Sequence, residues 1–160
     1  MDVRLLAVGR LKAGPERDLS ERYLDRARRT GAGLGLRDFS VREVAESRAQ
    51  RAPDRMAEEE AALAPILAEG GRIVCLDATG DLLGSEDFAA ALRSDAEAAL
   101  AHTTFVIGGP DGLGRQILAR ADRRLSFGRV TWPHQLARVL LAEQLYRAIT
   151  IISGHPYHRA

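Results

Sequence analysis

The stretch that decides the fold runs from Thr103 to Arg159 and reads TTFVIGGPDGLGRQILARADRRLSFGRVTWPHQLARVLLAEQLYRAITIISGHPYHR. It opens with an apolar run at residues 103–107 whose β-branched and aromatic residues predict a strand. A turn at residues 108–112 follows, and its glycines permit positive φ. Because glycine has no Cβ atom, the backbone of this turn could approach a ligand closely. The same spacing of glycines also occurs in a strand-to-helix turn that binds no ligand.

The glycine turn does not match the standard phosphate-binding signatures. Gly112 and Gly114 are two residues apart, but Ile117 stands where the dinucleotide-binding pattern has its third glycine. No Gly-Lys-Ser or Gly-Lys-Thr sequence occurs either. A dinucleotide-dependent enzyme that uses residues 108–114 as a phosphate loop is therefore a disfavoured alternative.

Strands and helices alternate along the whole chain. Apolar runs predict strands at residues 3–9, 36–44, 72–77, 103–107 and 125–127. Helices are expected at residues 15–29, 53–70, 85–100, 111–121 and 133–153. Such alternation predicts an α/β fold, with a mostly parallel sheet and helices on both faces. No linker or internal repeat divides the chain, so residues 1–160 are expected to form one domain.

Local signals refine these boundaries. Pro65 predicts a kink or an early end in its helix, and Pro133 suits the first position of the last helix. Ser85 is a good N-cap residue for the helix that follows it. Thr79-Gly80-Asp81 predicts a turn after the third strand.

Composition limits the class of protein. The chain has 160 residues, of which 46% are hydrophobic and 28% charged, a balance typical of soluble globular domains. The formal net charge is only +1, so any contact with RNA must come from local arginine clusters. Arg22, Arg26 and Arg29 form one such cluster on a helix face, where a solvated face is an equally simple interpretation.

Compartment and metal content follow from what the sequence lacks. Cys75 is the only cysteine, so there is no disulfide framework and no cysteine-based zinc site. No apolar run reaches membrane-spanning length, and the N-terminus has no secretory signal. We therefore expect a cytoplasmic protein that contacts no membrane and holds no metal.

Several separate motifs, in the same order, resemble the RlmH-type SPOUT methyltransferases. They are FVIGGPDGL at 105–113, LSF at 125–127, TWPHQL at 131–136 followed by Arg138-Val139, EQLYRA at 143–148 and HPYHR at 155–159. The likeness extends to the chain length and the opening strand, and is weak between about residues 28 and 60. It implies transfer of a methyl group from S-adenosylmethionine to N3 of a pseudouridine in helix 69 of 23S ribosomal RNA, within the assembled 70S ribosome.

The resemblance also implies where the cofactor binds. Family members form a deep trefoil knot, which here would lie within about residues 72–160, and bind the cofactor in it. Carried over by position, the cofactor residues are Leu76, Gly108, Phe127, Gly128, Arg129, Val130, Thr131 and Trp132. Such a site would hold adenine with main-chain groups and leave the methyl group accessible, and it requires no phosphate cradle.

An arginine interrupts the apolar stripe of the last helix. On a helical wheel Arg138 lies among Leu141, Leu145 and Ile149, where an unpaired charge would be costly. One possible partner is a carboxylate such as Glu143 of another subunit. The other is an RNA phosphate or the negative charge that develops on the pyrimidine, which would make Arg138 an anion stabiliser.

The tail at residues 155–159 combines aromatic, basic and imidazole groups. Two histidines three residues apart could suggest a metal, but no third ligand is nearby, and a frayed terminus is a further alternative. We favour a clamp on RNA, in which Tyr157 stacks on a base and Arg159 holds a phosphate. His158 is then a candidate general base for the N3 proton, because imidazole can accept a proton near neutral pH.

The last helix is apolar around most of its circumference. One core face needs less apolar surface than that, so we expect a symmetric homodimer that packs this helix across its two-fold axis. The tail of one subunit could then complete the pocket of the other. A noncatalytic ribosome-binding module of the same fold is the main alternative to an enzyme.

Overall fold

A parallel sheet forms the centre of the molecule. Within residues 1–67 and 70–158, which the computed structural model describes, five strands pair in the order β2-β1-β4-β3-β5, and every pair is parallel. The strands are β1 (Asp2–Val8), β2 (Asp38–Val44), β3 (Arg72–Leu82), β4 (His102–Ile107) and β5 (Arg123–Ser126). The predicted α/β class with a parallel sheet is confirmed.

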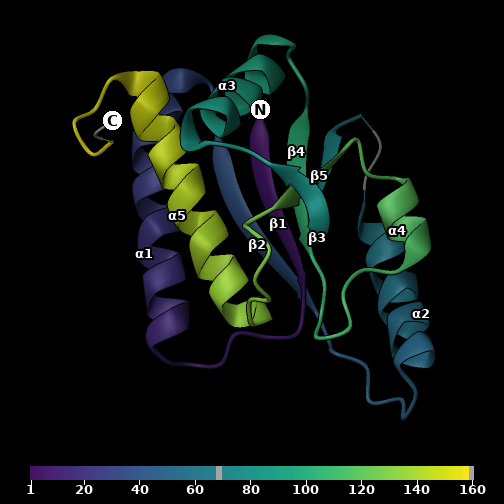
Figure 1. The fold of residues 1–160 in the computed structure, drawn as a ribbon. Coiled ribbons are helices and arrows are strands. Elements are labelled where there is room, and N and C mark those ends of the chain that lie inside the picture. The colour runs from purple at the N-terminus through teal and green to yellow at the C-terminus, as the bar shows by residue number, and fades with distance from the viewer. Residues whose placement is uncertain (68–69, 159–160) are drawn as a thin grey trace.

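Helices cover both faces of the sheet, as predicted. They are α1 (Pro15–Gly31), α2 (Ala52–Leu63), α3 (Ser85–Glu97), α4 (Arg115–Ala119) and α5 (His134–Ser153), with short 3-10 helices η1 (Ala32–Leu34) and η2 (Ala64–Ile66). Figure 1 shows α1, α3 and α5 on one face and α2 with α4 on the other. Among the described residues, no helix is long and apolar enough to cross a membrane.

The alternation of side chains along β1 explains this three-layer arrangement. Val3, Leu5 and Ala7 point into the core that packs under α1, α3 and α5. Leu6 and Val8 point into a second core under α2 and α4. Because successive side chains of a strand face opposite sides, one apolar strand supplies both cores.

The third strand is longer than its sequence suggests, and the predicted turn at residues 79–81 is wrong. β3 continues to Leu82, and its pairing with β5 shifts register between Leu76 and Asp81. A Cβ on Gly80 would lie 2.7 Å from the backbone of Arg124 and of Leu125. Gly80 therefore allows a close approach of β3 to β5, where the sequence pattern indicated only a reversal of the chain.

Helix ends differ from the expectations in smaller ways. Helix α2 ends at Leu63 and passes into η2 at Ala64–Ile66, so the early end predicted from Pro65 is confirmed. Gly84, not Ser85, is the N-cap of α3, and the Ser85 hydroxyl instead donates to Gln144 Oε1 at 2.9 Å. Pro133 is the N-cap of α5 and not its first helical residue. Threading of the chain as a trefoil knot stays a prediction.

Replacing Gly80 with alanine tests the close approach of β3 to β5. We expect the Gly80→Ala substitution to lower the free energy of unfolding by about 1–3 kcal/mol, because the new methyl group would overlap main-chain atoms that cannot rotate away. Urea denaturation gives the value. Gly33→Ala is the matched control, since a Cβ on Gly33 meets nothing within 4 Å. Equal midpoints for the two variants would contradict the β3–β5 geometry.

Candidate active site

A large cavity lies where β3, β4 and β5 end. The carboxyl ends of parallel strands meet at one edge of a sheet, and ligands of α/β proteins bind there. The cavity has a volume of about 660 Å³, within the range of pockets that enclose small organic molecules. Its lining comprises Leu76, Asp77, Ala78, Ile107, Gly108, Gly109, Pro110, Asp111, Gly112, Leu125, Ser126, Phe127, Gly128, Val130, Thr131, Trp132, Pro133, His134 and Ala137.

The structure brings most of the predicted cofactor residues together around this cavity. Leu76 from β3, Gly108 from the glycine turn and the segment after β5 all contribute to its wall. Of the eight residues that the resemblance implied, Arg129 is not among the lining residues, and its side chain is exposed. Three segments that are far apart in the sequence thus meet at one place.

Main-chain groups make up much of the cavity wall. A Cβ on Gly108 would lie 2.6 Å from the carbonyl carbon of Gly112, so the two ends of the turn come together only without a side chain. In the segment after β5, the Trp132 indole N–H donates to the Phe127 carbonyl at 3.2 Å. The Ser126 hydroxyl donates to the Gly128 carbonyl at 2.9 Å. These bonds hold the segment in a defined conformation.

His134 is a site residue that sequence reasoning missed. It is the first residue of α5, it lines the cavity, and its Nε2 atom lies 3.3 Å from the place of a Cβ on Gly9. Asp77 and Asp111 also line the cavity without having been predicted. A signal was available for all three: Asp77 ends the apolar run of the third strand, Asp111 lies in the glycine turn after β4, and His134 begins α5. Residues at these positions meet at the same edge of a parallel sheet.

Arg138 finds a partner that neither interpretation named. Its side chain is 2% exposed, and Nη1 lies 2.5 Å from Glu43 Oε1 of the same chain. Nη2 donates to the carbonyl oxygens of Val8 and Gly9. Burial lowers the pKa of the guanidinium group, and the hydrogen bond to Glu43 opposes that shift. The expected partners, Glu143 of another subunit or an RNA phosphate, are therefore replaced by a link between α5 and the end of β1.

The tail lies away from the cavity. Figure 1 places it at the C-terminal end of α5, whereas the cavity adjoins the first turn of that helix. The Tyr157 hydroxyl donates to Glu143 Oε1 at 3.2 Å, and His158 Nδ1 lies 3.5 Å from Arg147 Nη1. Burial is the largest cause that raises the pKa of Tyr157, and its contacts with Tyr23 and Glu143 raise it further. Arg159, the third predicted member of the clamp, lies outside the described residues.

An aromatic cluster anchors the tail to its own helix. The ring centroid of Tyr157 is 4.7 Å from that of Tyr146, which in turn is 6.1 Å from that of Tyr23. The Arg147 guanidinium lies 5.1 Å from the Tyr157 ring, and Arg26 of the predicted arginine face lies 5.9 Å from the Tyr146 ring. In this arrangement the Tyr157 ring packs on its own protomer.

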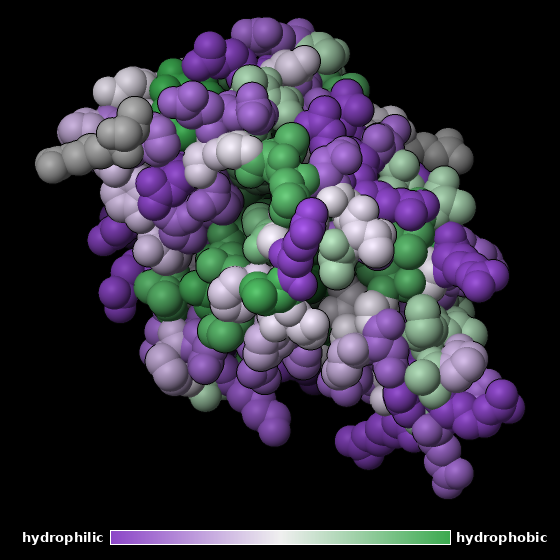
Figure 2. Space-filling view, viewed as in Figure 1, coloured by the Kyte–Doolittle hydropathy of each residue, from purple (hydrophilic) through white to green (hydrophobic). Residues whose placement is uncertain are grey.

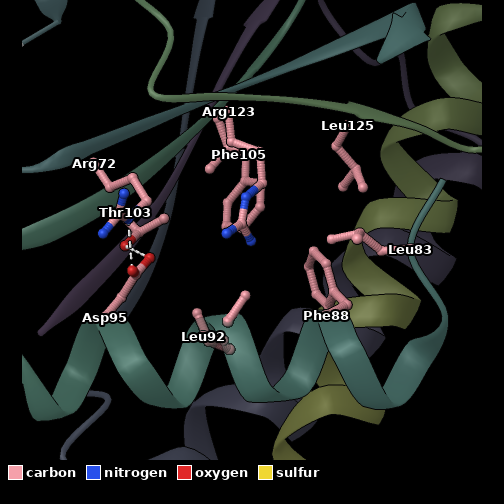
Figure 3. Close-up of a pocket in the computed structure, with 11 residues that line it drawn as sticks. Arg72, Leu83, Phe88, Leu92, Asp95, Thr103, Phe105, Arg123 and Leu125 are labelled. Carbon is pink, nitrogen blue, oxygen red and sulfur yellow. Dashed lines mark hydrogen bonds and ion pairs between the residues drawn. The ribbon is translucent and has the colours of Figure 1, made fainter. Parts of the chain in front are cut away.

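A second, much smaller cavity lies between the sheet and α3. Figure 3 shows Asp95 of α3 pointing toward Arg72 and Thr103 on the sheet. The Asp95 carboxylate accepts from Arg72 Nε at 2.6 Å and from the Thr103 hydroxyl at 3.0 Å. The volume of about 20 Å³ has room for roughly one water molecule. This polar group is thus satisfied within the fold, and the space is too small for a cofactor.

Apolar side chains gather outside the large cavity. Figure 2 shows them in the middle of the face that carries the segment between β5 and α5. Four large exposed apolar residues lie in this segment or in the elements next to it, and we call them the outer apolar face: Leu82 at the end of β3, Val130 and Trp132 in the segment, and Leu136 in the first turn of α5. A groove of about 390 Å³ joins Leu82, Trp132 and Leu140. Trp132 thus borders both this groove and the cavity.

Comparison with known proteins identifies relatives over the whole chain. A family profile described as "Predicted SPOUT methyltransferase" matches residues 1–158. A protein of Rhizobium leguminosarum bv. trifolii named ribosomal RNA large subunit methyltransferase H is 52% identical over 159 residues, which cover 99% of each chain. A protein of the same name from Rhodopseudomonas palustris is 52% identical over 160 residues, which cover each chain completely.

Two solved structures share the fold at low identity. A probable methyltransferase from Bordetella pertussis aligns with a TM-score of 0.51 and 17% identity, covering 92% of this chain and 95% of the other. A probable methylase family protein from Haemophilus influenzae aligns with a TM-score of 0.51 and 12% identity, covering 99% and 70%. These similarities support the fold alone.

Removing the buried guanidinium tests the link between α5 and β1. We expect Arg138→Leu to lower the free energy of unfolding by about 3 kcal/mol, because it removes the cation paired with Glu43 and the donor to two backbone carbonyls, while Glu43 keeps the Leu11 N–H. Urea denaturation measures the change. The exposed Arg22 on α1 provides the control, and Arg22→Leu should alter stability by less than about 0.5 kcal/mol. A small loss for both variants would show that the buried contacts contribute little.

Proposed function

The chain belongs to the SPOUT methyltransferase family, and from that membership we propose that it methylates ribosomal RNA of the large subunit. The observation that carries the proposal is the half-identical, end-to-end match to proteins named ribosomal RNA large subunit methyltransferase H. The match covers 99% of one relative and all of the other, and it includes every element around the cavity. The finer target is N3 of a pseudouridine in helix 69 of 23S ribosomal RNA, in the 70S ribosome.

S-adenosylmethionine is the proposed methyl donor, and the cavity has features that suit it. The volume of about 660 Å³ is sufficient for such a molecule, and the wall offers main-chain donors and acceptors for adenine. Gly108 and Gly112 leave their part of the wall free of side chains. Asp77 and Asp111 add carboxylates that can accept from hydroxyl or ammonium groups. The donor supplies an electrophilic methyl group on a sulfonium sulfur.

The transfer requires one proton to leave the target. A bond forms between N3 of the pyrimidine and the methyl carbon while the carbon–sulfur bond breaks, and the imide proton departs from N3. We propose His158 as the acceptor or positioner of that proton, and Tyr157 as the residue that stacks on the base. Both roles need the tail at a cavity, and the described tail lies beyond the other end of α5.

A homodimer reconciles these positions. Glu143, the residue that Tyr157 contacts, lies about two and a half helical turns along α5 from His134 in the cavity wall. We propose that two copies pack through the outer apolar face, so that each tail reaches the cavity of its partner. Exposed Leu82, Trp132 and Leu136 would then be buried, as expected of a stable interface.

Arg138 takes a different role in this proposal from the one first expected. Its guanidinium is 2% exposed and engaged by Glu43 and two carbonyl oxygens, so it does not face the cavity as a free cation. We propose that Arg138 is a positioning residue. It fixes the first turns of α5, and with them His134, relative to the end of β1.

Mapping modified nucleotides tests the proposed activity. Ribosomal RNA from cells without this protein should lack one methylated pseudouridine, and the wild-type gene should restore it. Gly108→Ala should fail to restore it, since the added methyl group would push the ends of the glycine turn apart. Quenching of the single tryptophan, Trp132, should report S-adenosylmethionine binding to the wild type and not to this variant. If ribosomal RNA carries the same modifications with and without the protein, the proposed methyltransferase activity is contradicted, and the noncatalytic binding module becomes the better explanation.

Mixing two inactive variants tests the shared site. One variant carries Tyr157→Ala and His158→Ala, and the other carries Gly108→Ala. If each tail serves the partner's cavity, half of the randomly mixed dimers contain one intact site, and about a quarter of the wild-type activity returns. A methyl-transfer assay on ribosomes that lack the modification measures it. No recovery from a mixture proven to exchange subunits would place the tail in its own protomer's site.

A further inference from the structure

Helix α2 supports the glycine turn from behind. Figure 1 shows α2 beside α4, on the face of the sheet opposite α5. Arg55 of α2 donates to both carboxylate oxygens of Asp111 in the turn, at 2.6 and 2.9 Å. Glu60 accepts the backbone N–H of Gln116 at 2.8 Å, at the start of α4. The turn and the start of the helix that follows it are thus held by side chains of one helix.

Between these two contacts lies a buried carboxyl group. Glu59 is 3% exposed, and its Oε1 accepts the backbone N–H of Ser47 at 3.0 Å. In the part of the chain that the structure describes, Glu59 Oε2 has no hydrogen-bond partner. A buried polar atom without a partner costs free energy, so its presence requires an explanation beyond stability.

The position of the carboxyl group supplies that explanation. Oε2 lies 3.1 Å, and Oε1 3.4 Å, from the place that a Cβ on Gly109 would occupy. The carboxyl group and Val8 Cγ1, which lies 3.0 Å from the same place, therefore fill the space of the missing side chain behind the turn. Gly109 lines the large cavity on its other side. The Glu59 carboxyl group thus packs against the backbone that forms this part of the cavity wall.

We propose that Glu59 is a positioning residue for cofactor binding: held by Ser47, its carboxyl group sets the position of Gly109 and with it the depth of the cavity. The inference rests on the proposed binding of S-adenosylmethionine in that cavity. It assigns to α2, which contributes no lining residue among those described, a part in cofactor affinity.

The burial of Glu59 and the charged groups around it make its contribution to stability depend on pH. Burial is the main cause that raises the pKa of Glu59; Glu46 after β2 and Asp111 in the turn raise it further, while the Ser47 N–H and Arg55 lower it. Arg55 is already bonded to Asp111 and to the carbonyl of Gln50, so it leaves Glu59 without an ion pair. A raised folded-state pKa gives stability below the ordinary glutamate pKa, and this stability is lost as the pH rises through the raised value.

Paired alanine variants on α2 test the proposal. Glu59→Ala should weaken S-adenosylmethionine binding by about tenfold in calorimetry, because it removes the support of Gly109 and leaves the Ser47 N–H unpaired. Glu58→Ala is the matched control: Glu58 is exposed and accepts a hydrogen bond from the Ser47 hydroxyl, so binding should change by less than about twofold. Equal effects of the two variants would overturn the proposal.

Hydrogen exchange gives a readout that needs no cofactor. The backbone amides of Gly109 and of residues 111–113 should exchange faster in Glu59→Ala than in Glu58→Ala or the wild type, and unchanged exchange would overturn the proposal. If the wild type binds no S-adenosylmethionine, the proposed function fails, and this measurement still decides the role of Glu59. Should Glu59→Ala not fold, Glu59→Asp takes its place, since the shorter side chain withdraws from Gly109.

The isosteric variant separates shape from charge. Glu59→Gln keeps the acceptor for Ser47 and the volume behind Gly109, so cofactor affinity should stay within about threefold of the wild type. The wild type should lose stability relative to Glu59→Gln as the pH rises through the raised pKa, measured by urea midpoints. Loss of binding in Glu59→Gln as severe as in Glu59→Ala would show that the carboxyl group does not act by filling this space.

Discussion

The buried guanidinium of Arg138 is the contact on which the arrangement of the site depends. A charge at that depth must be neutralised, and it is held by Glu43 and by the carbonyl oxygens that end β1. The contact joins the last helix to the first strand, at the sheet edge where the cavity opens. It thereby fixes the first turn of α5, and the segment after β5 has to span the remaining distance from Ser126 to His134.

A second layer of support acts on the opposite side of the cavity. The turn at residues 108–112 has two glycines whose added Cβ atoms would collide with neighbouring atoms, so it has few side chains of its own to hold it in place. Helix α2 compensates with Arg55, Glu59 and Glu60, which contact the turn or its flanks. The cavity thus lies between these two sets of contacts, and part of its wall is main chain that packs against residues outside the lining.

Much of this could be predicted from local sequence signals. Alternating apolar runs predicted the parallel sheet, and Pro65 predicted the early end of α2. The part of the cavity wall at residues 127–132 was implied by the family resemblance and not by local signals. Contacts between distant residues could not be predicted in this way. Glu43 lies 95 positions from Arg138 in the sequence, and nothing in the run of three glutamates at 58–60 distinguishes the middle one. Gly80 resembled a turn residue because the sequence does not reveal the neighbouring strand that it accommodates.

The place of β1 inside the sheet has a consequence for how the chain folds. One side of β1 pairs with β2, which follows closely, whereas the other side pairs with β4, so that Asp2 lies opposite His102. During synthesis that second side stays unpaired until most of the polypeptide has emerged. Pairings between such distant segments slow folding, and an open strand edge invites association with other chains meanwhile. The charged side chains of Asp2 and Arg4 along β1 offer one means of discouraging such encounters.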